Sequence, residues 1–166
     1  MPGLVLGTGL DIDAATDGRD RPDDDEWRKT QPDLLDISPL VNAVERLREG
    51  LERHRREPDD DQLRDGLIQR FEFIYELSHR MLRRYLRQVA ASPDAISQMP
   101  FQDMIRSGNE QGLLRGDWPA WRLYRDLRAR TSHTYAAAVA MQVVNCIPDF
   151  LAEAAHLRDQ LRQRMA

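Results

Sequence analysis

Apolar residues recur at helical spacing in two long stretches of the first half of the chain, with polar and charged residues between them. The first stretch predicts a helix from about Ser38 to Arg56, and the second predicts one from the aspartates at 59 to 61 to about Val89. Because Pro58 separates the two, an antiparallel helical hairpin is expected. The recurring apolar positions are Leu40, Val41, Val44, Leu47 and Leu51, then Leu63, Leu67, Phe71, Ile74, Leu77, Met81, Tyr85 and Leu86.

Prolines and glycines predict shorter elements in the middle of the chain. Ser92-Pro93 places a capping residue before a proline, which is typical of a helix start, so a short helix is expected there. Another short helix is expected from Pro100 through Ile105, and Gly108 and Gly112 are expected to break it.

The last third of the chain predicts two further helices. One begins at the cap-and-proline segment 117–119, and the other covers residues 134–164 with a kink at Pro148. The sequence has no strand pattern, internal repeat or glycine-rich phosphate loop. The expected fold is therefore an all-α antiparallel bundle of four to five helices, with an irregular N-terminal arm in front of it.

The predicted arm and the predicted bundle differ in net charge. The net charge of the chain is -4, but residues 1–36 hold ten acidic and four basic residues, a balance of 4 - 10 = -6. The remainder has 20 basic and 18 acidic residues, a balance of +2. Residues 1–33 also lack hydrophobic periodicity and are predicted to be an acidic, disordered arm before a bundle of residues 34–166. The arm is either a solubilising tail or an acidic cover for a basic RNA-facing surface.

Composition narrows the class of protein further. A chain of 166 residues with 41% hydrophobic residues is long enough for one domain with a real core. Its lone Cys146 excludes a disulfide framework and fits a cytoplasmic protein. No apolar run is long enough to cross a membrane. Because His54 and His156 have no partners at metal-ligand spacing, neither a metal nor a cofactor is predicted.

The densest chemistry lies in residues 121–135. Arg128 and His133 are five residues apart, so on one uninterrupted helix they would point about 140° away from each other. Thr131 and Ser132 are good capping residues, so one helix can end and a new one begin at Ser132. His133 would then lie in a first helical turn, where the helix dipole favours an anion and keeps the imidazole neutral.

These residues resemble a known motif. Arg128-x4-His133-x-Tyr135 resembles the R-x(4-6)-H-x-Y signature of HEPN-domain toxins, and Trp121 fits the subgroup known as nucleotidyltransferase substrate-binding proteins. Residues 64–77 are similar to the helix "RDA-IQRFEF-x-(F/Y)EL" of that family. The resemblance covers about residues 37–164, with Ser92-Pro93, Gly112-Leu113-Leu114 and Ile147-Pro148 following in the expected order.

The resemblance implies a HEPN-like bundle that forms a homodimer and acts as a toxin with metal-independent endoribonuclease activity. Arg128 would bind the phosphate of an RNA substrate, and His133 would act as general base or general acid. Tyr135 would accept AMP from a cognate minimal nucleotidyltransferase. Arg130, Thr131, Ser132 and Trp121 would support the site. In the alternative interpretation the chain is a non-catalytic substrate-binding subunit, whose groove presents a substrate or its own Tyr135 to a nucleotidyltransferase. The single residues also have structural alternatives: Arg128 would pair with a carboxylate, His133 would be a hydrogen-bond donor at a helix start, and Tyr135 would pack there.

Two positions depart from the family pattern. Ala129 follows the arginine where the family usually has a polar residue, and Ala136 stands at a position that is commonly acidic in the subgroup. The first departure favours the non-catalytic alternative. Arg130 is a candidate to compensate, although its simplest role is an i,i+4 ion pair with Asp126.

The second predicted helix also carries polar residues with more than one interpretation. His79 is a candidate second catalytic group, but no motif supports it, so it ranks below His133. The arginines of this helix are either a solvated face or a surface for RNA or a partner. They are Arg70, Arg80, Arg83, Arg84 and Arg87, with Glu72 among them.

Overall fold

The computed structural model describes residues 35–131 and 137–166, and those residues contain six α-helices and no strand. This confirms the all-α prediction, with one helix more than the expected four to five. The predicted arm of residues 1–33 lies outside the described residues. The helices are α2 (Ser38–Arg56), α3 (Asp61–Val89), α4 (Pro93–Gln98), α5 (Phe101–Glu110), α6 (Trp118–Thr131) and α7 (Ala137–Arg164).

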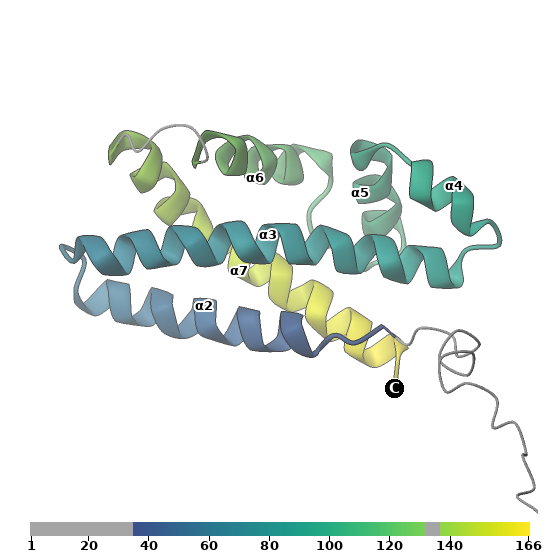
Figure 1. Ribbon diagram of the computed structural model, residues 1–166, viewed down its shortest axis with the longest axis horizontal. Helices are drawn as coiled ribbons and strands as arrows, with labels where there is room; N and C mark the ends of the chain where they lie inside the picture. The colour runs from purple at the N-terminus through teal and green to yellow at the C-terminus, as the bar shows by residue number, and fades with distance from the viewer. Residues whose placement is uncertain (1–34, 132–136) are drawn as a thin grey trace, which may run out of the picture. The chain divides into compact units, whose positions relative to one another are not determined.

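Helix α3 is the centre of the bundle, because it packs against α2, α4, α5, α6 and α7 (Figure 1). It begins where the aspartates predict: the Asp60 carboxylate accepts the backbone N–H groups of Gln62 at 2.8 Å and Leu63 at 3.1 Å. Helix α2 ends at Arg56, two residues before Pro58, and runs back along α3 (Figure 1). The predicted hairpin is therefore confirmed.

Helix α5 differs from its prediction. It does not end at Gly108 but continues to Glu110. A Cβ atom at position 108 would lie 3.0 Å from a methyl group of Leu82 and 3.1 Å from one of Leu114. The glycine therefore lets the helix pack closely on its neighbours instead of breaking it. The chain turns at Gly112, whose φ of +73° is the left-handed conformation that glycine adopts without strain.

The last two helices agree with the sequence pattern where they are described. Helix α6 ends at Thr131, and α7 runs from Ala137 through Pro148 to Arg164. The predicted helix start at Ser132 lies outside the described residues. The two helices pack against each other, and both pack against α3.

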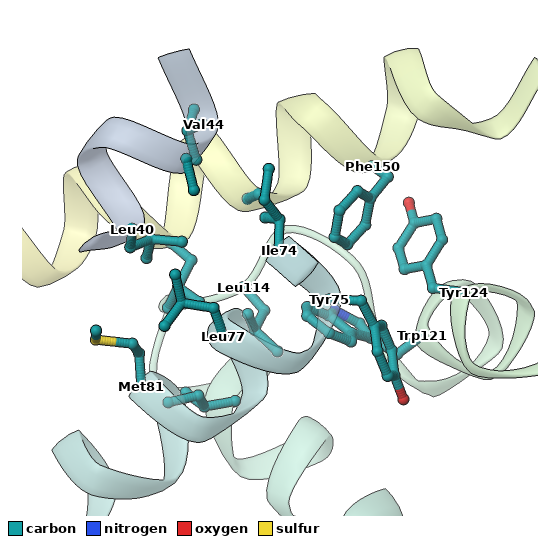
Figure 2. Close-up of a cluster of buried hydrophobic side chains, with 14 of the residues drawn as sticks. Leu40, Val44, Ile74, Tyr75, Leu77, Met81, Leu114, Trp121, Tyr124 and Phe150 are labelled. Carbon is teal, nitrogen blue, oxygen red and sulfur yellow. The ribbon is translucent and has the colours of Figure 1, made fainter. Parts of the chain in front are cut away.

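An aromatic cluster holds α6 against α3 and α7. Trp121 and Tyr124 of α6 approach Phe150 of α7, and Tyr75 of α3 lies beside Trp121 (Figure 2). The centroid of the Phe150 ring is 4.9 Å from that of Phe71 and 5.1 Å from that of Tyr124, with edge-to-face geometry in both pairs. Such pairs add about 0.5–1.5 kcal/mol each beyond the burial of their area. This cluster fixes the helix that carries Arg128.

Candidate functional site

Arg128 lies in the last turn of α6 and faces two carboxylates of α3. Its Nε is 3.6 Å from Glu76 Oε1, and its Nη1 is 3.9 Å from Glu72 Oε1. The two glutamates are four residues apart, so they lie on the same face of α3. About a quarter of the Arg128 side chain is exposed, and this exposed part does not include Nε, which is buried. The carboxylate pairing of the structural alternative for Arg128 is thus present, on a side chain that is still partly exposed.

A groove lies beside Arg128 where α3, α5 and α6 meet. It is shallow and open, with a volume of about 440 Å³. Its lining residues are Tyr75, Glu76 and His79 of α3, Phe101 of α5, and Arg125, Arg128 and Ala129 of α6. The groove therefore combines cations, a carboxylate, an imidazole and aromatic rings on one surface.

His79 is tied to Arg128 through Glu76. Its Nε2 is 3.0 Å from Glu76 Oε2, while the other oxygen of the same carboxylate is the one nearest to Arg128 Nε. Burial lowers the pKa of His79, and the hydrogen bond to Glu76 opposes that shift. The imidazole is therefore neutral at neutral pH. The sequence placed His79 below His133 as a candidate, but in the structure His79 lines the same groove as Arg128. Its spacing of three residues from Glu76 on one helix is the sequence signal for the His79–Glu76 pair.

Two further lining residues of the groove, Arg125 and Phe101, contact each other. The guanidinium carbon of Arg125 lies 5.5 Å from the centre of the Phe101 ring, a cation–π contact. Phe101 packs edge-to-face on Trp118, with ring centroids 5.9 Å apart, and on His79 at 5.6 Å. The ring of Phe101 is half-buried, whereas Arg125 is exposed. A solvated cation thus lies over a fixed aromatic surface.

Trp121 lies two helical turns before Arg128 and is fully buried. Its Nε1 donates to Glu153 Oε1 of α7 at 3.3 Å. The Glu153 carboxylate also accepts the backbone N–H groups of Arg115 at 3.0 Å and Gly116 at 2.9 Å. Trp121 therefore anchors the start of α6. Sequence reasoning missed Glu153, although this acid falls on the apolar face of the last helix, three residues after Phe150.

Comparison with known proteins shows which family this chain belongs to. A family model described as "nucleotidyltransferase substrate binding protein like" matches residues 35–163. The chain belongs to this family. The finding confirms the resemblance drawn from the motifs, since the family is the subgroup that Trp121 and the segment 64–77 indicated.

Individual relatives are similar to this chain in sequence and in fold. A protein of Haemophilus influenzae named "Probable ribonuclease HepT" is 48% identical over 104 residues, which cover 63% of this chain and 70% of that protein. A solved structure from Haemophilus influenzae, described as the fold of a substrate binding domain of a nucleotidyltransferase, matches with a TM-score of 0.72 and 38% identity, over 76% of this chain and 99% of that one. A structure from Thermus thermophilus matches with a TM-score of 0.54 and 29% identity, over 76% and 98%.

The end of α6, where the family motif lies, departs from the sequence prediction in one ion pair. Arg130 Nη1 donates to Gln142 Oε1 of α7 at 2.7 Å, and the carboxylate of Asp126 lies 4.0 Å from Arg122 instead. The predicted Arg130–Asp126 pair is therefore wrong, because α7 returns beside α6 and brings an acceptor within reach. Thr131 lies in α6, and its hydroxyl donates to the backbone carbonyl of Arg128 at 2.8 Å.

The remaining residues of the family motif, Ser132, His133 and Tyr135, lie outside the described residues, as does Ala136. Ala129 is described and lines the groove, so a methyl group lies in the groove where the motif resemblance leads one to expect a polar side chain. The carboxylates of Glu72 and Glu76 on α3 lie within ion-pair distance of Arg128.

Neither metal-ligand clusters nor membrane-spanning helices occur in the described part of the chain. No three His, Cys, Asp or Glu side chains there are grouped closely enough to hold a metal ion. His156 donates from Nε2 to the carbonyl oxygen of Gly112 at 3.0 Å, and His54 is buried in α2. None of the described helices is both long and apolar enough to cross a bilayer.

Proposed function

We propose that this chain is a HEPN-type toxin, a metal-independent endoribonuclease that acts as a homodimer in the cytoplasm. The observation that carries the proposal is Arg128 at the edge of an open groove, followed by His133 five residues later in the family motif. The similarity to a relative named probable ribonuclease HepT supports it. The fold supplies the support for Arg128 through the buried Trp121.

In the proposed reaction Arg128 binds the phosphodiester and offsets the charge that builds up on it. A base removes the proton of the ribose 2′-hydroxyl, and the 2′-oxygen attacks phosphorus. The bond from phosphorus to the 5′-oxygen breaks, and that oxygen takes a proton from an acid. His133 supplies one of these two proton transfers, and a homodimer would bring a second copy of it. The products are a 2′,3′-cyclic phosphate and a 5′-hydroxyl.

The carboxylates beside Arg128 are compatible with this role. The two ion-pair distances, 3.6 and 3.9 Å, exceed the roughly 2.7–2.9 Å of a direct charge-assisted hydrogen bond. A phosphate, which can accept two parallel N–H groups of arginine, can compete with such contacts. The glutamates then hold the guanidinium towards the groove until RNA arrives.

We further propose that a cognate minimal nucleotidyltransferase silences the toxin by transferring AMP from ATP to the Tyr135 hydroxyl, with release of pyrophosphate. The new phosphodiester would place a negative charge two residues from His133, where it would repel the RNA backbone. The match to nucleotidyltransferase substrate-binding proteins supports such a partner.

The test is cleavage of total RNA by the purified protein in excess EDTA, with wild type beside His133→Ala. His133→Ala is expected to reduce the cleavage rate at least about 100-fold, the lower end of what a general acid or base contributes. His156→Gln, which changes a histidine bonded to Gly112, is the control and should cut like wild type. No cleavage by wild-type protein that mass spectrometry finds free of AMP would refute the nuclease.

The second candidate is a substrate-binding subunit that presents a ligand or its own Tyr135 to the nucleotidyltransferase. Ala129 is the observation that favours it, because the polar side chain usual in the family is missing beside Arg128. In that case Tyr135→Phe would abolish AMP incorporation by the partner. His133→Ala would leave both binding of the partner and AMP incorporation close to wild type.

A further inference from the structure

We propose that the groove between α3, α5 and α6 is a subsite for one unpaired nucleobase of RNA, adjacent to the phosphate that Arg128 binds, with Phe101, His79 and Arg125 as its contact residues. The inference rests on the proposed function for the role of Arg128. It adds a substrate class, single-stranded RNA, which the family motif does not specify.

Aromatic rings from two elements meet at this groove. The centroid of His79 is 5.4 Å from that of Tyr75 and 5.6 Å from that of Phe101, and Tyr75 and Phe101 are 6.4 Å apart. The rings of Trp118 and Trp121 also pack against Phe101, with centroids 5.9 and 6.5 Å from its own. The rings are thus fixed by the core while the groove remains open to solvent. Nucleobases stack on surfaces of this kind regardless of their sequence.

The charged lining suits a nucleotide. Among the lining residues Arg125 and Arg128 contribute two positive charges and Glu76 one negative charge, so with a neutral His79 the balance is 2 - 1 = +1. Arg125 already lies over Phe101, and a guanidinium plane stacks on a base as it does on an aromatic ring. The Glu76 carboxylate offers an acceptor to the N–H groups of a base. The phosphate and the base would therefore meet different residues of one surface.

The size of the groove and the need for an accessible base face favour single-stranded over double-stranded RNA. Its volume of about 440 Å³ lies in the range of roughly 300–1,000 Å³ that is usual for small-ligand sites. Bases within an RNA duplex are stacked on each other, and their faces do not reach a protein side chain. Only an unpaired nucleotide can place its base against Phe101.

The experiment is fluorescence anisotropy with a labelled 2′-O-methyl decanucleotide, alone and annealed to its complement. The methyl group blocks the 2′-hydroxyl, so the probe binds without being cut. Arg125→Gln is expected to weaken single-strand binding about tenfold, a loss within the range of one base stacked on a side chain. Arg122→Gln is the matched control, because Arg122 is exposed on the same helix, outside the groove lining, and its loss changes net charge equally. It should change binding by less than about twofold.

Phe101→Leu provides a second variant, with folding checked by circular dichroism, and should also weaken single-strand binding about tenfold. Equal effects of Arg125→Gln and Arg122→Gln would overturn the subsite, as would equal binding of duplex and single strand by the wild type. The cleavage assay separates the two proposals. RNA cutting without Arg125-dependent binding would retain the nuclease and refute the subsite. Arg125-dependent binding without cutting would retain the subsite and refute the nuclease.

Discussion

The two ends of α6 hold their charged partners in opposite ways. At the start, the buried Glu153 accepts three N–H groups at 2.9–3.3 Å, one of them from the indole of Trp121. At the end, Arg128 faces Glu72 and Glu76 at 3.9 and 3.6 Å beside an open groove. The same helix is thus fixed at one end and open to a ligand at the other.

Solvent explains the difference. Only 4% of Glu153 is exposed, so protein donors must replace the water that its carboxylate loses. The Glu76 side chain is 42% exposed, and water competes with its ion pair. Ordered contacts two turns away therefore position Arg128, while the charges around it can rearrange when a phosphate binds. Three substitutions and one titration test this contrast.

The largest effect is expected for Trp121→Ala. The substitution leaves a cavity among Tyr75, Tyr124 and Phe150 and removes one donor from Glu153, so the free energy of unfolding should fall by about 4 kcal/mol. Urea denaturation measures it. Leu123→Ala, at a side chain 52% exposed on the same helix, is the control and should change it by less than about 0.5 kcal/mol. Equal losses would show that the start of α6 is not an anchor.

Glu153→Gln should have the next largest effect. An amide keeps only one oxygen acceptor and places an NH₂ group beside backbone N–H donors, so the free energy of unfolding should fall by about 2 kcal/mol. Glu110→Gln, at an exposed position ending α5, should leave it unchanged under the same denaturation conditions. A neutral result at position 153 would mean that the segment 115–116 is held by packing alone.

Glu76→Gln should change stability by less than about 1 kcal/mol, because its ion pair is exposed to solvent. Its effect should appear in binding instead. The amide of Gln keeps one oxygen acceptor for a base but removes the negative charge beside Arg128, so binding of single-stranded RNA is expected to strengthen, and anisotropy at constant salt measures this. A loss of stability as large as that of Glu153→Gln would contradict the contrast between the two ends.

The smallest effect concerns the titration of His79. Burial lowers its pKa from the usual 6.5, so the fold favours the neutral imidazole. The resulting contribution to stability is present above about pH 6.5 and is lost as the pH falls below that value. NMR titration should find the pKa of His79 below 6.5, and lower still in Glu76→Gln, because the hydrogen bond to Glu76 raises it. A pKa above 6.5 would show that the charged form is preferred.

Local signals were sufficient to predict most of the fold. The bounds of α2 and α3 follow from apolar periodicity, Pro58 and the aspartate cap. Gly108 misled the prediction of α5, since a glycine that breaks a helix and one that allows close packing look the same in sequence. The sequence around Gly108 does not show that Leu82, 26 residues earlier in the chain, packs against this position.

The candidate site was less accessible to sequence reasoning. Arg128 and Trp121 follow from the motif, but Glu76, His79 and Phe101 reach the groove from other helices. Local spacing predicts which residues share a face of one helix, not which faces meet. Glu153 had a usable signal, an acid on an apolar stripe, which in a core requires donors from the protein.

Gly108 has a consequence beyond the packing of α5. Phe101 is the first residue of that helix, so the close approach of α5 to α3 at Gly108 also sets how near its ring lies to His79. An added methyl group at position 108 would require the side chains of Leu82 and Leu114 to shift by a few tenths of an ångström, and a larger side chain would press α5 away from α3, although position 108 is not part of the groove lining. A residue about two helical turns from Phe101 thereby affects the spacing between the two helices that form the groove.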